Sequence, residues 1–277
     1  MIGLSDIVKS FGRERALDGV SIDFPVGRMT ALLGPNGSGK TTALKTLLGL
    51  VRPDRGTVLW NGAAPTDERA VREHISYMPQ IARFPENLTI REFLAMIADL
   101  RPRQPTRTEE MLARFELADL LPKPLKGLSG GTRQRVCAVM TLMYDAPVYI
   151  FDEPTAGLDP LMARRFKDAV AREKAAGKTI IFTSHIMGDI EELADHIVFL
   201  LEGAVVFDGT LDALYARTGE HAAEDAIAVL IARAGGNTRS GIAPSASDGN
   251  QIRFSDTVID HHAAADAGGT RLREVRA

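Results

Sequence analysis

The sequence has little cysteine, no long apolar run and no excess of basic charge. Cys137 is its one cysteine, so no disulfide can form within the chain, and this usage fits a reducing compartment. No stretch approaches the roughly 18 consecutive apolar residues of a membrane-spanning helix. Residues 1–6 lack the basic and apolar regions of a signal peptide. The net charge of -3 excludes a general basic field for binding nucleic acid.

The remaining composition is that of a globular protein. Hydrophobic residues make up 45% of the 277 positions, so the chain can bury a substantial core. From residue 29 to residue 218, short apolar runs alternate with helical patterns, which predicts an α/β domain. Residues 2–11 and 17–24 alternate apolar and polar side chains, which predicts two half-buried strands before it.

A glycine-rich segment follows the apolar run 29–33 and precedes a helical pattern over residues 41–50. It matches the G-x-x-x-x-G-K-[ST] pattern of a phosphate-binding loop and consists of Gly34, Pro35, Asn36, Gly37, Ser38, Gly39, Lys40, Thr41 and Thr42. Its glycines let backbone N–H groups turn inward, and the helix start attracts anions, so the loop can bind a polyphosphate. We expect Lys40 to reach the β- and γ-phosphates and the Thr41 hydroxyl to ligate Mg²⁺.

Two carboxylates, Asp152 and Glu153, end the apolar run that starts at residue 148. The carboxyl ends of parallel strands lie on the same edge of a sheet as a phosphate loop. We therefore expect Asp152 to hold Mg²⁺ opposite Thr41, and Glu153 to polarise an attacking water as a general base. A solvated acidic pair before a turn is the alternative, which the preceding apolar run disfavours.

A second glycine site, Ser129-Gly130-Gly131, opens a helix predicted over residues 129–144. Its N–H groups can also face an anion, although the chain has only one lysine-bearing loop. A head-to-tail pair of chains explains both features, because each nucleotide then lies between the phosphate loop of one chain and the Ser129 segment of the other. The alternative is a plain serine N-cap followed by flexible glycines.

Three further residues are candidates for the same site. Gln80 and His185 each follow a predicted strand; the glutamine can ligate Mg²⁺ and order a water, and the histidine can reach a γ-phosphate. Phe11 ends the first predicted strand and is either a core aromatic or a ring stacked on a nucleotide base. A lone glutamine or histidine at a strand end is more often structural, so a functional role for Gln80 and His185 is supported only by the other candidate residues.

Residues 81–146 predict an all-helical insertion in the α/β domain. A capping box over residues 89–92 opens its first helix, a second helix covers residues 108–117, and Cys137 lies on the third as a buried structural thiol.

The sequence patterns that indicate helices and strands become weaker beyond residue 218. Residues 219–277 form a C-terminal extension, either a small accessory element or a partly disordered tail. Within it we predict a helix over residues 223–234, a linker over 235–250 and a short strand over 252–254.

These motifs together resemble the nucleotide-binding domain of ABC transporters over residues 1–218. The order of motifs is that of the family: Walker A at 34–42, the Q-loop at Gln80, the signature at 128–132, Walker B at 148–153, the D-loop at 156–159 and the switch histidine at His185. Thr132 stands where glutamine is common, and Gly157 where alanine is frequent. Neither departure removes a catalytic group.

The resemblance implies a P-loop NTPase fold of the ABC type, with a mixed β-sheet core, an antiparallel β subdomain and an inserted α-helical subdomain. It implies ATP and Mg²⁺ as ligands, with ATP bound by Phe11, residues 34–42, Ser129, Gly130, Gly131 and Asp159. It also implies hydrolysis by Glu153, His185, Lys40 and Gln80, with Mg²⁺ at Thr41, Gln80 and Asp152. Phe11 falls where the family has its base-stacking aromatic, which favours the stacking role.

The same resemblance implies the partners and the location. A second copy of the chain forms the dimer, and a separate integral membrane permease docks near the Gln80 loop and the helical insertion. The protein is then cytoplasmic and peripheral on the inner face of the membrane, with no nucleic acid expected. The alternative is a soluble ABC-type ATPase that acts on ribosomes or nucleic acid.

Within the family, residues 77–89 and 199–203 resemble the copper-linked ATPase that serves nitrous oxide reductase maturation. That resemblance implies a copper- or sulfur-species cargo handled by the partners. Met140, Met143, His261 and His262 do not indicate a copper site in this chain, because methionines at helical spacing are more often core.

Overall fold

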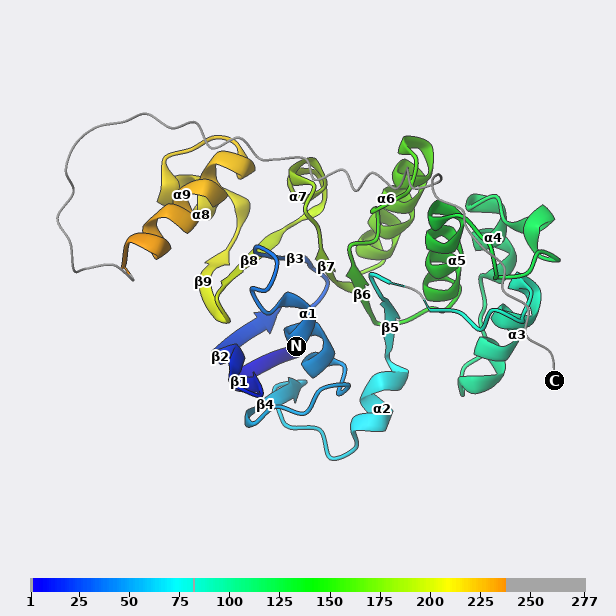
Figure 1. Ribbon diagram of the computed structural model, residues 1–277, viewed down its shortest axis with the longest axis horizontal. Coiled ribbons are helices and arrows are strands. Elements are labelled where there is room, and N and C mark those ends of the chain that lie inside the picture. Colours follow the sequence, from blue (N-terminus) through cyan, green and yellow to red (C-terminus); the bar gives the residue numbers. More distant parts are fainter. Residues whose placement is uncertain (1, 82, 238–277) are drawn as a thin grey trace, which may run out of the picture. The chain divides into compact units, whose positions relative to one another are not determined.

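The computed structural model describes residues 2–81 and 83–237. Two sheets dominate the described part of the chain (Figure 1). The larger has six strands in the order β5-β6-β7-β3-β8-β9, parallel except for the antiparallel pair β8 and β9. The smaller has three antiparallel strands in the order β2-β1-β4. The mixed core sheet and the antiparallel subdomain are therefore both present as predicted.

The strands and helices alternate along the chain as an α/β fold requires. The strands are β1 (Ile2–Phe11), β2 (Glu14–Phe24), β3 (Met29–Leu33), β4 (Arg55–Trp60), β5 (Ile75–Met78), β6 (Val148–Asp152), β7 (Thr179–Thr183), β8 (His196–Leu201) and β9 (Ala204–Gly209). The helices are α1 (Lys40–Leu47), α2 (Glu68–Glu73), α3 (Ile90–Leu100), α4 (Thr108–Arg114), the short 3₁₀ helix η1 (Ala118–Leu120), α5 (Gly130–Leu142), α6 (Pro160–Ala175), α7 (Met187–Leu193), α8 (Leu211–Thr218) and α9 (Ala223–Asn237).

Successive residues of the central strands face two separate hydrophobic clusters. Phe151 and Phe182 point to the side covered by α5 and α6, where they meet Val136, Val139 and Phe166. Ile150 and Ile181 point to the other side, where α1 and the small sheet contribute Leu44, Leu47, Leu17 and Ile22. Figure 1 shows the same arrangement, with α5, α6 and α7 on one side of the large sheet and α1 on the other. This two-sided burial explains why β3, β6 and β7 are continuous apolar runs.

Arg107 links the helical insertion to the core through several hydrogen bonds. Arg107 precedes α4, forms an ion pair with the buried Glu173 of α6 and donates to the Tyr149 hydroxyl at 2.8 Å. It also donates to the carbonyls of Leu142 and Tyr144, each at 2.9 Å. A partly buried cation with this many acceptors fixes the start of α4 against β6 and α6.

The local signals of the insertion are confirmed. Thr89 and Glu92 form the predicted capping box at the start of α3, and Ser129 caps α5. Cys137 is buried, and burial raises the pKa of its thiol to about 12, so it is a structural thiol as expected.

Several predicted boundaries were wrong by a few residues. β2 begins at Glu14 rather than at residue 17, because a two-residue turn at Gly12 joins it directly to β1. The second insertion helix ends at Arg114 rather than at residue 117, because Glu116 takes a left-handed φ of 51° that a helix cannot contain. α1 ends at Leu47, and Gly49 follows with a φ of 67°.

The described C-terminal part packs onto the larger sheet. α8 ends at Thr218 before Gly219, and α9 begins at the predicted Ala223 and contacts α8, α7 and β9. The predicted strand over 252–254 lies outside the described residues. No helix in the described part of the chain is long and apolar enough to cross a bilayer.

Candidate functional site

The glycine loop between β3 and α1 has the backbone that the sequence pattern requires. Gly34, Gly37 and Gly39 have φ values of 148°, 80° and 102°, all in the region that disfavours side chains. A Cβ on Gly34 would lie 2.1 Å from the Leu200 carbonyl oxygen, and a Cβ on Gly39 would lie 2.5 Å from the Ala16 carbonyl oxygen. The loop therefore passes so close to neighbouring backbone that only glycine fits at either end.

Lys40 lies inside this loop and is mostly buried. Its Nζ donates to the carbonyl of Gly34 at 2.6 Å and to that of Pro35 at 3.0 Å. Burial lowers the pKa of Lys40, while the negative charges of Glu153 and Asp152 act in the opposite direction. The ammonium is thus close enough to the strand-end carboxylates to feel both charges, as expected for one edge of a parallel sheet.

Replacement of Gly34 tests the close approach directly. We expect Gly34→Ala to lower the Tm and to abolish nucleotide binding, because the methyl group clashes with Leu200 and the backbone strain alone costs about 1–3 kcal/mol. Gly12→Ala is the control, since it also has a positive φ of 62° but no heavy atom of the described residues within 4 Å of its Cβ position. Thermal unfolding and ATP binding by calorimetry measure both effects; a fully functional Gly34→Ala protein would contradict the loop geometry.

Asp152 ends β6 as a buried carboxylate. It is 2% exposed, and its Oδ1 accepts a hydrogen bond from the Thr183 hydroxyl at 2.7 Å. Burial raises the pKa of Asp152; the nearby Glu153 charge adds to this effect, while the Thr183 hydrogen bond and Lys40 oppose it. Burial makes the ionised form of this carboxylate unfavourable, and a cation bound beside the phosphate loop would stabilise it.

Glu153 takes a left-handed conformation with a φ of 50°, and its side chain joins two of the predicted residues. Its Oε2 accepts from Gln80 Nε2 at 2.9 Å, and its Oε1 lies 2.6 Å from His185 Nε2. The structure thus brings together Gln80, Glu153 and His185, which come from the ends of β5, β6 and β7. All three follow neighbouring strands, which is why they meet at one edge.

The buried charge of Asp152 gives a prediction on stability. Because the folded state raises its pKa above the unfolded value, the ionised carboxylate destabilises the fold at every pH above that raised pKa. We expect Asp152→Asn to raise the Tm at neutral pH by a few degrees while lowering Mg²⁺-dependent ATP hydrolysis. The Thr183 hydrogen bond can persist to the asparagine oxygen. An unchanged or lower Tm in calorimetry would show that Asp152 is stabilised in place by Lys40.

Ser129, Gly130 and Gly131 start α5 but are not joined to the phosphate loop within the chain. The Ser129 hydroxyl accepts from the Thr132 N–H at 3.2 Å, as an N-cap does. Among the described residues, no hydrogen bond links these three to residues 34–42. Gly130 is open to solvent, whereas a Cβ on Gly131 would lie 3.0 Å from the Gly157 carbonyl oxygen. Within the described part of the chain, these residues therefore share no hydrogen bond with the phosphate loop.

Phe11 and Asp159 are two further residues predicted to bind the nucleotide. Phe11 is 53% exposed at the end of β1, with Lys9 Nζ 5.4 Å from its ring centroid, so it is not the core aromatic that the sequence also allowed. The Asp159 carboxylate caps α6 by accepting from the N–H groups of Leu161 and Met162. Base stacking by Phe11 and nucleotide binding by Asp159 remain predictions.

Two residues that support the site were missed by the sequence reasoning. The Thr183 hydroxyl accepts from the Glu153 N–H at 2.9 Å, and Gln134 Nε2 donates to the Glu153 carbonyl at 3.2 Å. A signal for Gln134 exists in the sequence: it shares the buried face of its helix with Cys137 and Ala138, where a polar side chain needs a partner.

The residues present fit a nucleotide polyphosphate with Mg²⁺. The loop leaves no room for a Cβ at either end, and the Ser38 hydroxyl is buried without a hydrogen-bond partner among the described residues. The Thr41 hydroxyl, the Gln80 amide and the Asp152 carboxylate offer oxygen ligands of the kind that Mg²⁺ prefers.

Comparison with known proteins decides the family. A family model described as "ABC transporter" matches residues 17–156. A daunorubicin resistance ATP-binding protein, DrrA3 of Streptomyces coeruleorubidus, is 36% identical over 232 residues, which are 82% of this chain and 72% of that protein. The chain belongs to the ATP-binding proteins of ABC transporters. As a member of that family it is an ABC-type ATPase.

Two further comparisons agree with this family. An uncharacterized ABC transporter ATP-binding protein of Nostoc sp. is 38% identical over 205 residues, covering 72% of this chain and 61% of its own length. A solved structure of the ATP binding subunit of an ABC transporter has a TM-score of 0.77 and 29% identity, covering 83% of this chain and 99% of that one. The ABC ATPase fold is thus shown by sequence and by structure.

Proposed function

We propose that this protein is the ATP-hydrolysing subunit of an ABC transporter, acting as a head-to-tail dimer on a separate membrane subunit. The observation that carries the proposal is the Glu153 carboxylate, held by Gln80 and His185 at the edge of the sheet where Lys40 closes the phosphate loop. This arrangement supports in-line attack of water on a bound γ-phosphate.

The chain's own groups account for each part of the reaction. The loop N–H groups and the Lys40 ammonium bind the β- and γ-phosphates, and Phe11 offers an exposed ring for the base. Glu153 takes one proton from the attacking water as the bond to the leaving ADP oxygen breaks, so the products are ADP and phosphate. His185 contacts the γ-phosphate, and Gln80 orients the water. Mg²⁺ held by Thr41, Gln80 and Asp152 would neutralise phosphate charge.

We propose the dimer because the two segments predicted to bind the nucleotide share no hydrogen bond within the described residues. Within one chain, Ser129–Gly131 open α5 on a face that is not joined to residues 34–42. A second copy in head-to-tail orientation supplies its own Ser129 segment to the first copy's nucleotide. In this arrangement ATP bridges two chains and closes the dimer, and loss of the γ-phosphate lets it open.

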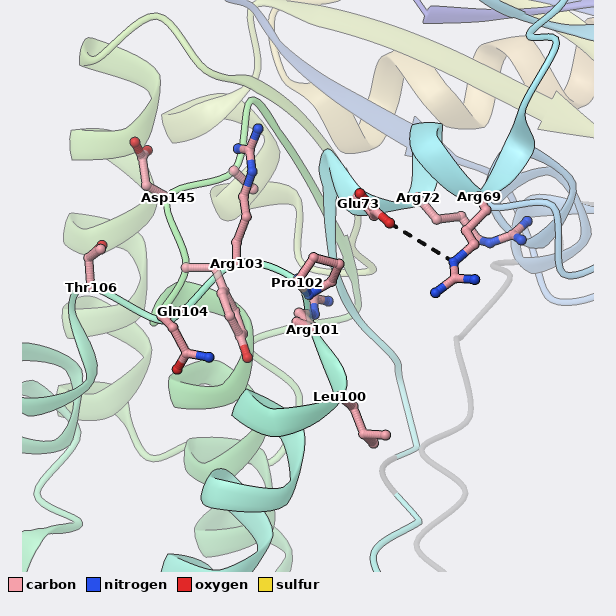
Figure 2. A pocket seen from close by; sticks show the side chains of 12 residues that line it. Arg69, Arg72, Glu73, Leu100, Arg101, Pro102, Arg103, Gln104, Thr106 and Asp145 are labelled. Atoms are coloured by element: carbon pink, nitrogen blue, oxygen red, sulfur yellow. Dashed lines mark ion pairs between the residues drawn. The ribbon is translucent and has the colours of Figure 1, made fainter.

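We propose that the membrane subunit docks over the helical insertion. A cavity of about 590 Å³ lies between α2 and the end of α3, and four of its lining residues are arginines: Arg69, Arg72, Arg101 and Arg103. Figure 2 shows the α2 side chains across from the segment that follows α3, where the exposed Leu100 lies next to Arg101 at the end of the helix. Only Glu73 and Asp145 among the lining residues are acidic, so the cavity suits a partner loop with acidic and apolar side chains.

Charge reversal at this cavity tests the docking. We expect Arg69→Glu with Arg103→Glu to lose the multi-span membrane protein that co-purifies with the wild-type chain, because like charges then face each other. ATP binding by the isolated protein should not change. Arg164→Glu with Arg172→Glu on α6 is the matched control, since both side chains are exposed. Co-sedimentation of the wild type with ribosomes or nucleic acid at physiological salt, in place of a membrane protein, would overturn the transporter proposal.

The cargo is proposed from the relatives. DrrA3 is named for daunorubicin resistance, which favours a drug-like organic cargo for the transporter. The copper- or sulfur-species cargo predicted from residues 77–89 and 199–203 has no support from these relatives. Transport assays with the reconstituted complex, comparing a fluorescent anthracycline with copper, separate the two.

A further inference from the structure

Gln134 is a buried polar side chain in the signature helix α5. It is 7% exposed and lies one turn after the glycines that open the helix. Its Nε2 donates to two backbone carbonyls of another segment, that of Glu153 at 3.2 Å and that of Pro154 at 3.0 Å. The contact spans 19 and 20 positions of the chain, so it is a tertiary link and not a helix cap.

One of the two carbonyls that Gln134 binds belongs to a strained residue. Glu153 has a φ of 50°, a conformation that costs free energy for a residue with a side chain. Its peptide groups are held on both sides, since its N–H donates to the Thr183 hydroxyl and its carbonyl accepts from Gln134. Removing the Gln134 donor leaves two carbonyls without that partner and lets the Glu153 backbone relax.

The helix start and the Glu153 segment also touch at a second point. A Cβ on Gly131 would lie 3.0 Å from the Gly157 carbonyl oxygen, so α5 packs closely against the loop that follows Glu153. On its other side, the Thr155 hydroxyl donates to the Asp189 carboxylate of α7 at 2.9 Å. A displacement at the start of α5 therefore reaches residues 153–157 through direct contacts.

We infer that Gln134 is a positioning residue for Glu153 and links the two nucleotide sites of the dimer. This inference rests on the proposed function, in which Ser129–Gly131 contact the partner's nucleotide and Glu153 activates water at the chain's own nucleotide. Through the hydrogen bonds of Gln134, binding of a nucleotide at one site then determines how the Glu153 carboxylate is oriented at the other site.

The test is Gln134→Met, which keeps the side-chain length and removes the donor. We expect kcat for ATP hydrolysis to fall about tenfold, because a small misplacement of a general base weakens catalysis strongly. The KM for ATP should change by less than about twofold, since the phosphate loop is untouched. Thr141→Val is the control, because it removes a buried hydroxyl of the same helix whose acceptors are the Cys137 and Tyr77 carbonyls and not those of residues 153–154.

A double mutant separates positioning from a general loss of structure. In a Glu153→Gln background, Gln134→Met should leave the residual single-turnover rate within about twofold, since it acts through the carboxylate that is already gone. An equal tenfold loss in both backgrounds would overturn the inference. If Glu153→Gln alone retains wild-type turnover, the proposed role of Glu153 as general base fails; if Glu153→Gln is inactive and Gln134→Met has wild-type kcat, only the inference fails.

Gln134→Glu gives a second test that does not depend on the methionine variant folding. An ionised glutamate has no donor for the two carbonyls, whereas a protonated one can donate its O–H. We expect the ratio of variant to wild-type kcat to rise as the pH is lowered from about 8 to about 6, because burial beside carbonyls raises the pKa of a carboxyl. A ratio that is constant across this range would overturn the inference.

Discussion

Glu153→Gln is expected to lower the turnover of ATP by about 10²- to 10⁴-fold, the contribution typical of a positioned general base. An amide of the same shape can still accept from Gln80, which now donates to the carboxylate at 2.9 Å, so the surroundings persist. It cannot take a proton from water. ATP affinity should be retained, because the phosphate loop and Lys40 are unchanged. Phosphate release at saturating ATP and ATP binding by calorimetry measure the two effects.

A matched control for this change exists in the helical insertion. Glu116 also has a left-handed φ, 51°, and is exposed, with one ion pair to Arg165. Glu116→Gln should therefore leave turnover within about twofold, since an exposed ion pair contributes at most about 1 kcal/mol to stability. Full turnover in Glu153→Gln would mean that another group activates the water. Loss of ATP binding in that variant would mean that Glu153 supports the loop rather than the reaction.

Most of the predictable parts of the fold are determined by residues that are close together in the sequence. The strand, glycine loop and helix at residues 29–47 are contiguous in sequence, and the turn geometry allows only glycine at positions 34 and 39. The capping box at Thr89 is likewise contained in four residues. Asp152 and Glu153 could be placed at the sheet edge because parallel strands in a doubly covered sheet end on the same side.

The contacts that escaped prediction all join distant segments. Gln134 binds a carbonyl 19 positions away, Thr183 binds an N–H 30 positions away, and Arg107 pairs with Glu173 across 66 positions. Side chains that bind backbone leave no residue-specific pattern at the other end, because every peptide offers the same carbonyl. Motif spacing therefore identifies groups that touch the ligand better than those that hold such groups in place.

Gly130→Asp is expected to abolish ATP-driven dimer formation and to lower hydrolysis about 10²-fold or more, while the isolated chain stays folded and binds ATP. No heavy atom of the described residues lies within 4 Å of a Cβ built at Gly130, and the residue is exposed in the first turn of α5. An acidic side chain suits a helix start, so the Tm should not fall. In a head-to-tail dimer, however, it would face the partner's nucleotide, and like charges brought together cost several kcal/mol.

Because the added side chain clashes with none of the described residues of its own chain, its effect on hydrolysis reports on a second chain. Ala213→Asp is the control: it adds the same acidic side chain to the first turn of α8, an exposed helix start that Thr210 caps as Ser129 caps α5. Light scattering with and without ATP, combined with phosphate release, distinguishes the variants. Wild-type hydrolysis by Gly130→Asp would show that each phosphate loop works without the partner's Ser129 segment, since a carboxylate placed there could then have no phosphate to repel.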